Sequence, residues 1–197
     1  AGSYGNASYA RETEGLPEFY EASPPVLRGD NLTLADSSPA AVVRGGQPFM
    51  VLGYRAGGET HAGTDEPLHR QAFAITGRPH AIVVNRDGER FGDESHAAYM
   101  SEAAVTFDRQ LRCFPNCPSY LIVDDRFRHR IAAESFLGDD SWPEEWLQAD
   151  DLTDLAKRLE IDPGGLARTV DRFNGDVTTG HDSQFGRGLH PHAAQMN

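Results

Sequence analysis

The stretch Ala81–Ser95, AIVVNRDGERFGDES, decides the fold expected for this chain. Four apolar residues run into Asp87-Gly88, and an Asp-Gly pair supplies the positive φ that a tight hairpin turn needs. We predict that the chain reverses there and that a short strand returns. Ser95 can then cap a helix that carries Tyr99. Charged residues at such a strand-to-helix junction suit a functional site, and a hairpin end that is simply solvated is an equal alternative.

Other segments also have the pattern of regular structure. Tyr120–Val123 is apolar and predicts a buried strand, whereas Asp151 and Asp162-Pro163 are helix start signals. Asn174-Gly175 has the composition of a helix end. The sequence therefore predicts an α+β fold, in which a small sheet is covered by helices. The sheet contains a β-hairpin over 81–91 and the strand 120–123, and the helices are expected near 96–110, 152–160 and 163–174.

The remaining segments are expected to be irregular. Residues 1–28 are rich in Gly, Ser and Pro and should be mostly loop, and Pro39 should divide 30–43 into two short turns. Residues 44–79 contain many glycines, and we predict one strand, at Phe49–Leu52, within a long excursion. Such an excursion either lines a site or is merely mobile.

The charge of the chain limits its partners. It has 30 acidic and 18 basic residues among 197, a net charge of −12, which argues against nucleic acid and anionic membranes. The arginines of 126–130 follow two aspartates, so a solvated, salt-bridged helix face is favoured over a phosphate site. The longest apolar runs are far shorter than the ~20 residues that span a bilayer. No signal peptide opens the chain, so a cytoplasmic protein is expected.

The two cysteines give little support for a metal site. Cys113 and Cys117 stand four residues apart, and no nearby pair of histidines completes the four ligands of a structural zinc site. No secretory signal favours a disulfide. We therefore predict no metal and two reduced thiols in a loop.

Four stretches, in order along the chain, carry a resemblance to a known family. They are GDNLTLA at 29–35, the hairpin pattern of 81–95 with its following tyrosine, Leu155–Asn174 with its IDP and RFN elements, and FGRG at 185–188. This ordered set resembles the substrate-capping region of FAD-dependent oxidoreductases of the fumarate reductase / 3-ketosteroid dehydrogenase family. The resemblance covers nearly the whole chain and implies the cap domain of a two-domain flavoprotein.

The turn that would hold the flavin dinucleotide is missing from these residues. Such an enzyme needs a strand, a G-x-G-x-x-G turn and a helix around the pyrophosphate, and the chain has no such turn. We therefore expect a fragment: 1–35 from the end of an FAD-binding domain, 36–188 as the capping domain and 189–197 as a tail. FAD is expected in the full-length parent and not on this chain alone. The expected partners are the missing FAD-binding domain of the same polypeptide and a small-molecule substrate.

The resemblance also implies a reaction, namely redox chemistry at a carbon–carbon bond next to a carbonyl or carboxylate. Tyr99 is the nearest counterpart of the catalytic tyrosine of the ketosteroid branch, and a tyrosine that packs its ring inward is the alternative. We predict a cofactor-binding role for Arg90, Glu94 and Ser95. Arg90 and Glu94 are expected to act by pairing and holding the hairpin end against the flavin domain. Ala97-Ala98 stands near the arginine that the fumarate branch uses as proton donor, which disfavours fumarate chemistry.

A protein of another class remains the alternative. It would be a stand-alone, non-catalytic binding module for a small molecule or a protein that evolved without its flavin domain. A G-x-G-x-x-G turn upstream of Ala1 in the full reading frame would favour the enzyme.

Overall fold

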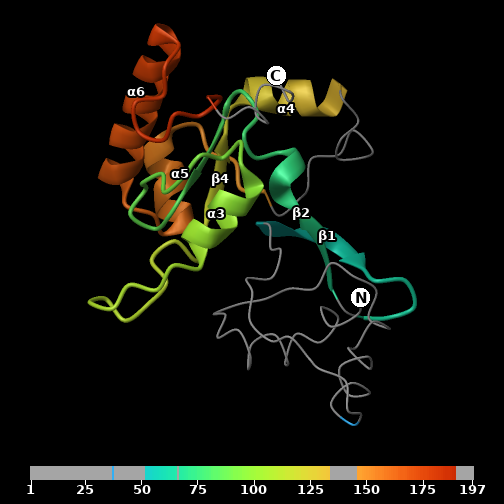
Figure 1. The fold of residues 1–197 in the computed structure, drawn as a ribbon. Coiled ribbons are helices and arrows are strands. Elements are labelled where there is room, and N and C mark those ends of the chain that lie inside the picture. Colours follow the sequence, from blue (N-terminus) through green and yellow to red (C-terminus); the bar gives the residue numbers. More distant parts are fainter. Residues whose placement is uncertain (1–36, 38–51, 66, 134–145, 190–197) are drawn as a thin grey trace. The chain divides into compact units, whose positions relative to one another are not determined.

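The computed structural model describes residues 37, 52–65, 67–133 and 146–189, and the chain divides into two compact units, 1–71 and 72–197 (Figure 1). The predicted loop over 1–28 lies outside the described residues, as do nearly all of 30–43 and most of the predicted strand 49–52. The predicted domain limits at 35/36 and 188/189 stay predictions.

The first unit contains a strand pair that the sequence did not indicate. β1 (Gly53–Thr60) and β2 (Pro67–Gln71) are antiparallel, with a register shift in the middle of β1. Gly58, whose φ is 65°, lies within that shift, where the five steps from Arg55 to Thr60 on β1 lie opposite two steps on β2. Arg70 and Glu59 pair across the strands at 2.7 Å. The prediction of a single strand in this glycine-rich region is therefore wrong, because a bulge lets glycines lie inside a strand.

The second unit is α+β, as predicted. β3 (Ala81–Val84) and β4 (Tyr120–Val123) pair in antiparallel register, so the strand 120–123 and its place beside the hairpin are confirmed. No helix in the described part of the chain is both long and apolar enough to cross a membrane. The described residues of this unit form the helices η1 (Ala72–Ala74), α3 (Ala97–Ala104), α4 (Asp125–Ala133), α5 (Leu152–Leu159) and α6 (Pro163–Thr179).

The chain reverses after β3 at the predicted turn. The N–H of Gly88 donates to the carbonyl of Asn85 at 3.1 Å, and the N–H of Asn85 donates to the carbonyl of Glu89 at 3.0 Å. Gly88 has a φ of 70°, the left-handed conformation that glycine adopts without strain. The returning segment makes a single bridge, Val84 to Arg90, in place of the predicted short strand. The turn is confirmed, and the second strand of the hairpin is reduced to that bridge.

This turn docks on the start of α6. The N–H of Asp162 donates to the carbonyl of Arg86 at 2.8 Å. A Cβ atom added to Gly88 would lie 2.2 Å from the backbone nitrogen of Leu166, and one added to Gly165 would lie 1.8 Å from the carbonyl oxygen of Asp87. The two backbones touch because both positions lack a side chain.

We expect Gly88→Ala to destabilise the protein by about 1 to 3 kcal/mol. The added methyl group meets the backbone of α6, and alanine is strained at a positive φ of 70°. Gly175→Ala is the matched control, since nothing lies within 4 Å of an added Cβ there. In the interior of α6 alanine should stabilise by about 0.5 to 1 kcal/mol. Urea unfolding measures both, and equal effects would show that the turn does not dock in solution.

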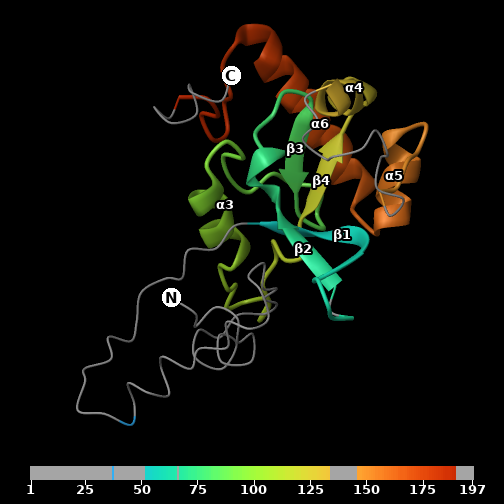
Figure 2. The same ribbon diagram turned by 90° about the vertical axis from the view of Figure 1, so that its right-hand side faces the viewer.

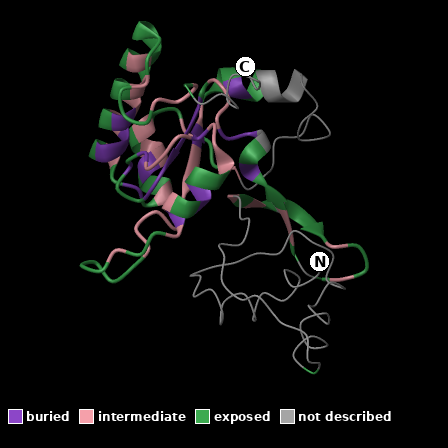
Figure 3. Cartoon of the chain, in the orientation of Figure 1, coloured by how far each residue is buried: buried purple, intermediate pink, exposed green. Residues whose placement is uncertain are grey.

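The core of the second unit lies between the strand pair and the two C-terminal helices. Buried residues gather on the strands and on the helix faces that meet them (Figure 3). Ala81 and Val83 alternate along β3 with the core residues and are buried as well, so both faces of this strand are covered. Figure 2 shows α3 and α5 on opposite sides of the β3–β4 pair. The buried core cluster consists of Ile82, Val84, Ile122, Ala156, Ile161 and Leu166.

The two C-terminal helices begin where the sequence predicts and end differently. The side chains of Asp151 and Asp162 accept backbone N–H groups at the starts of α5 and α6. The predicted end of α6 at Asn174-Gly175 is wrong, because the helix runs to Thr179. A glycine inside a helix costs only about 1 kcal/mol, whereas Gly180 takes the left-handed conformation of a C-cap with φ of 70°.

The helix that carries Tyr99 is shorter than predicted and has another cap. α3 ends at Ala104, where the predicted helix would reach residue 110. Beyond it the side chain of Asp108 accepts the N–H groups of Gln110 and Leu111, a local turn that competes with helix. The predicted cap at Ser95 is also wrong, since His96 caps the helix by accepting the N–H of Tyr99 at 3.4 Å.

Candidate functional site

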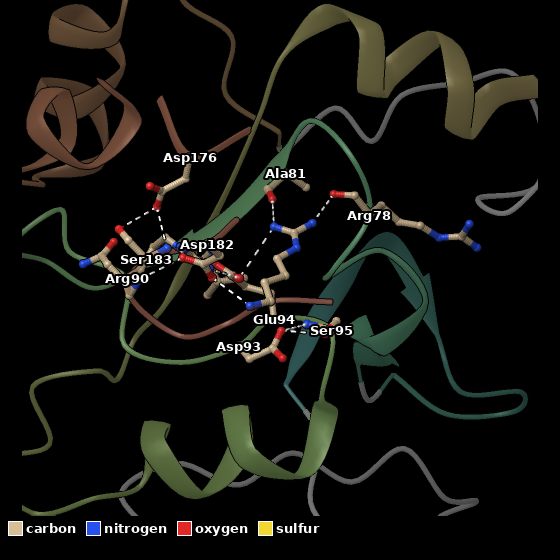
Figure 4. A network of polar contacts seen from close by, with 12 residues as sticks. Arg78, Ala81, Arg90, Asp93, Glu94, Ser95, Asp176, Asp182 and Ser183 are labelled. Carbon is tan, nitrogen blue, oxygen red and sulfur yellow. Dashed lines mark hydrogen bonds and ion pairs between the residues drawn. The ribbon is translucent and has the colours of Figure 1, made fainter. Parts of the chain in front are cut away.

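Four charged side chains meet at the end of the hairpin, and together they are called the charge cluster. Arg90 and Glu94 come from the segment between the turn and α3, whereas Asp182 and Arg187 come from the loop after α6. The side chains of Arg90 and Glu94 are 0% exposed, and that of Asp182 is 6% exposed. Figure 4 shows Asp182 beside Arg90, with Glu94 next to them. The cluster therefore joins two segments that lie far apart in the sequence.

Arg90 uses its guanidinium to hold both carboxylates. Its Nε and Nη2 each donate to Glu94 at 2.7 Å, which gives a bidentate pair. Its Nη1 and Nη2 donate to the two oxygens of Asp182 at 3.0 and 2.9 Å. The rings of Phe173 and Phe185 lie 5.0 and 5.3 Å from the guanidinium carbon. The predicted pairing of Arg90 with Glu94 is thus present, and it is buried.

Arg187 ties the same loop to β3. Its Nη1 donates to the carbonyl of Ala81 at 2.7 Å, and its Nη2 donates to the carbonyl of Arg78. Its Nη1 also lies 3.6 Å from a carboxylate oxygen of Glu94. Glu94 in turn accepts the backbone N–H of Val83 at 3.2 Å. Both arginines and Glu94 therefore fix the loop and the hairpin end to one strand.

The surroundings shift the pKa values of this cluster in opposite directions. Burial disfavours the charged form of Arg90, but its hydrogen bonds with Glu94 and Asp182 outweigh burial and raise the pKa of Arg90. Burial opposes the ionised form of Asp182, but the hydrogen bonds from Arg90 and from the N–H groups of Arg187 and Gln184 lower the pKa of Asp182 well below its ordinary value. Burial lowers the pKa of Arg187, and its carboxylate neighbour Glu94 opposes this shift. Arginine stays protonated at any ordinary pH, so among these shifts it is the lowered pKa of Asp182 that links the stability of the cluster to acid.

We expect Asp182 to make the stability of the protein sensitive to acid. Because its pKa is lower in the folded chain than in the unfolded chain, its contribution is fully present above about pH 5. As the pH falls below about 4, the unfolded chain takes up a proton that the folded chain does not, and stability decreases. Urea midpoints between pH 6 and 3 test this. The Asp182→Asn variant should start less stable and lose part of the acid slope, and an unchanged slope would contradict the assignment.

The candidate catalytic tyrosine lies on the surface, five residues after Glu94 of this cluster. Tyr99 is in the first turn of α3 and is 55% exposed, so its side chain is not buried in the core. Its ring stacks on the ring of His96 with centroids 3.9 Å apart. Ser95 donates to Asp93 through its N–H at 2.9 Å and through its hydroxyl at 2.6 Å. The structure thus places Ser95 and Tyr99 close together in sequence and outside the charge cluster, whereas Arg90 and Glu94 lie inside it.

Sequence reasoning missed part of the site. It singled out FGRG at 185–188 without assigning a role to Arg187, and it did not single out Asp182. Two signals were available in the sequence, namely Arg187 between two glycines and the carboxylates of Asp93 and Glu94 after the hairpin. No local pattern, however, predicts which of these charged side chains pair. In the part of the chain that the structure describes, no three His, Cys, Asp or Glu side chains gather in a group that could hold a metal ion.

No family model matches the chain, but several known proteins are similar to it. Among curated proteins, 4-oxocyclohexanecarboxylate 2-dehydrogenase of Sinomonas cyclohexanicum is 28% identical over 84% of this chain and 29% of its own length. 3-Oxosteroid 1-dehydrogenase of Mycolicibacterium smegmatis is 31% identical over 59% of this chain and 22% of its own length. Fumarate reductase (cytochrome) of Shewanella frigidimarina is 33% identical over 95% of this chain and 30% of its own length.

These relatives include both branches that the sequence motifs indicate. The chain matches a region of the fumarate reductase / 3-ketosteroid dehydrogenase family. The chain spans 22 to 30% of the lengths of the three relatives named above. A solved 3-ketosteroid delta1-dehydrogenase of Sterolibacterium denitrificans has the same fold over 99% of this chain and 35% of its own, with a TM-score of 0.68 and 22% identity. The predicted resemblance to this family is confirmed.

Proposed function

We propose that this chain is the substrate-capping part of a longer FAD-dependent oxidoreductase that removes hydrogen from a carbon–carbon bond next to a carbonyl. The observation that carries the proposal is the exposed Tyr99 on a helix whose start is fixed beside the buried charge cluster. The names of two relatives support it, since both describe dehydrogenases of oxo compounds.

In this reaction the protein has to move a proton. A carbonyl makes the hydrogen on the neighbouring carbon acidic, and the second hydrogen leaves the next carbon with its electron pair as a hydride, which bound FAD accepts. The Oη atom of Tyr99 takes this proton and gives its own hydroxyl proton to water, to which the exposed side chain is open, as the carbon–carbon double bond forms. The stacked His96 holds the ring from one side, and its backbone is part of the same helix start.

The sequence of this chain lacks the turn that would cradle the pyrophosphate of FAD. No G-x-G-x-x-G turn is present, and Arg90 and Glu94 have no exposed side-chain surface to offer a ligand. We propose that FAD is held by the rest of the longer polypeptide. Ser95, which is partly exposed, then lies toward the cofactor, and Arg90 and Glu94 act by holding the Ser95 backbone in place.

Reduction of an unsaturated dicarboxylate is the second candidate, because the fumarate reductase matches 95% of the chain. The residues after the hairpin argue against it. Ala97 and Ala98 occupy the first turn of α3, where the resemblance would place an arginine as proton donor. An alanine cannot supply a proton, so the dehydrogenation of an oxo compound is favoured.

The full-length protein decides between these functions. We expect it to purify with FAD and to oxidise a 3-oxosteroid or a 4-oxocyclohexane carboxylate with an artificial electron acceptor, whereas fumarate should be a poor oxidant of the reduced enzyme. The 197-residue chain mixed with FAD and desalted should show no visible flavin absorbance. A stoichiometric yellow fragment would refute the capping role. A colourless, inactive full-length protein would favour a binding module.

A further inference from the structure

The charge cluster is balanced only while Asp182 is ionised. Arg90 and Arg187 carry two positive charges and Glu94 and Asp182 carry two negative ones, and the most exposed of the four side chains, that of Arg187, is 11% exposed. A buried charge without a partner is strongly destabilising. Loss of the Asp182 carboxylate would therefore leave one excess positive charge inside the protein.

Asp182 connects the loop after α6 to Arg90. Its carboxylate accepts the N–H groups of Gln184 at 3.1 Å and Arg187 at 3.0 Å from its own loop. The same two oxygens accept the guanidinium of Arg90, which belongs to a segment 92 residues earlier in the chain. Asp182 thus sets where the guanidinium of Arg90 lies relative to this loop.

The position of Arg90 determines, through Glu94, where α3 begins in space. Its other N–H groups hold Glu94, and Glu94 stands two residues before His96, the cap of α3. On the far side, a Cβ atom added to Gly77 would lie 2.7 Å from the Cα atom of Ser95, so the backbone has no room to move toward Gly77. The segment between Glu94 and Tyr99 is therefore held on both sides.

We propose that Asp182 is a positioning residue for Tyr99 and acts through Arg90 and Glu94. The inference rests on the proposed catalytic role of Tyr99. Without the Asp182 carboxylate the guanidinium of Arg90 loses two of its four hydrogen bonds. Glu94 and the start of α3 are then no longer held in one position. A displacement of a reacting group by about 1 Å can lower a rate by about 10²-fold.

The test compares two aspartates in the full-length enzyme, Asp176 in the last turns of α6 and Asp182 in the loop after it (Figure 4). Asp182→Asn should lower kcat by about 10- to 100-fold while KM changes by less than about 3-fold, because binding is kept and alignment is lost. Asp176→Asn is the matched control, since Asp176 accepts the N–H and the hydroxyl of Ser183 and makes no contact with Arg90 among the hydrogen bonds described. It should leave kcat within about 2-fold.

A double-mutant cycle shows whether the effect passes through Tyr99. In the Tyr99→Phe background, Asp182→Asn should change kcat by less than about 2-fold, because the aligned group is already gone. An equal loss in both backgrounds overturns the positioning role. The single variant Tyr99→Phe reports separately on the proposed function, so the two failures are distinguishable.

A charge-balanced variant separates alignment from stability. Asp182→Asn with Arg187→Gln returns the cluster to zero net charge, with Arg90 and Glu94 as its remaining ions. We expect its melting temperature to recover toward that of the parent while kcat stays low and coupled to Tyr99. If kcat recovers together with the melting temperature, Asp182 only stabilises the fold and the inference is wrong. This variant also carries the test if Asp182→Asn alone does not fold.

Discussion

Tyr99→Phe in the full-length enzyme is expected to lower kcat by about 10² to 10⁴ with an oxo substrate, because an acid–base group contributes that much to a proton-transfer step. The substitution removes only the hydroxyl. The ring can still stack on His96, whose ring centroid lies 3.9 Å away, and α3 keeps its cap because the N–H of residue 99 remains. KM and FAD content should therefore change little.

The control for this substitution is a tyrosine that packs against the core and away from α3 in the sequence. Tyr120→Phe removes a hydroxyl from a half-buried residue that packs against the buried core cluster, and kcat should stay within about 2-fold of the parent value. Turnover is measured with an oxo substrate and with a dicarboxylate. If Tyr99→Phe keeps most of its activity with both classes, Tyr99 is a packing residue and the proposed proton transfer is wrong.

Glu94→Gln is expected to destabilise the protein by about 3 to 5 kcal/mol, the usual effect of removing one partner from a buried ion pair. Glutamine keeps the shape of the side chain but leaves Arg90 and Arg187 with Asp182 as the remaining carboxylate of the cluster. One amide N–H also replaces an oxygen that accepts the guanidinium of Arg90 at 2.7 Å. FAD retention should fall together with stability.

A matched ion pair of the same spacing makes this test sharp. Asp154 and Arg158 also stand four residues apart, with their nitrogen and oxygen 2.8 Å from each other, but their side chains are 44% and 53% exposed. Asp154→Asn should therefore cost less than about 1 kcal/mol. Urea unfolding at pH 7 compares the two variants. If both lose the same amount of stability, burial does not strengthen the Arg90–Glu94 pair.

The parts of the fold that could be predicted are those set by short sequence patterns, such as turns and helix starts. Asp87-Gly88 marks a turn because few residue pairs tolerate its backbone conformation, and Asp151 and Asp162-Pro163 mark helix starts through the hydrogen bonds that their side chains make. Helix ends were less certain, because Gly175 and Gly180 both satisfy the local rule and only the surrounding structure selects one.

The candidate site was predictable only in part. Arg90 and Glu94 stand four residues apart, so their pairing could be expected from the sequence. Ser95 looks like a helix cap, but its hydroxyl is engaged with Asp93 and the cap passes to His96. Asp182 contacts Arg90 across a sequence separation of 92, and no periodicity or motif in one sequence encodes such a contact.

The residues of the charge cluster are far apart in the sequence, and this separation also affects the order in which the unit can fold. Arg90 and Glu94 leave the ribosome before Asp182 and Arg187, and Arg187 joins β3 across a separation of 106 residues. Contacts between distant residues form slowly, because a long chain segment must be closed before they stabilise anything. We therefore expect that β3 and the hairpin end stay incompletely neutralised during synthesis until the residues after α6 have emerged. A nascent chain that stalls before Asp182 would contain β3 and the hairpin end, with Arg90 still lacking the carboxylate of Asp182. We expect chaperones to bind such an intermediate.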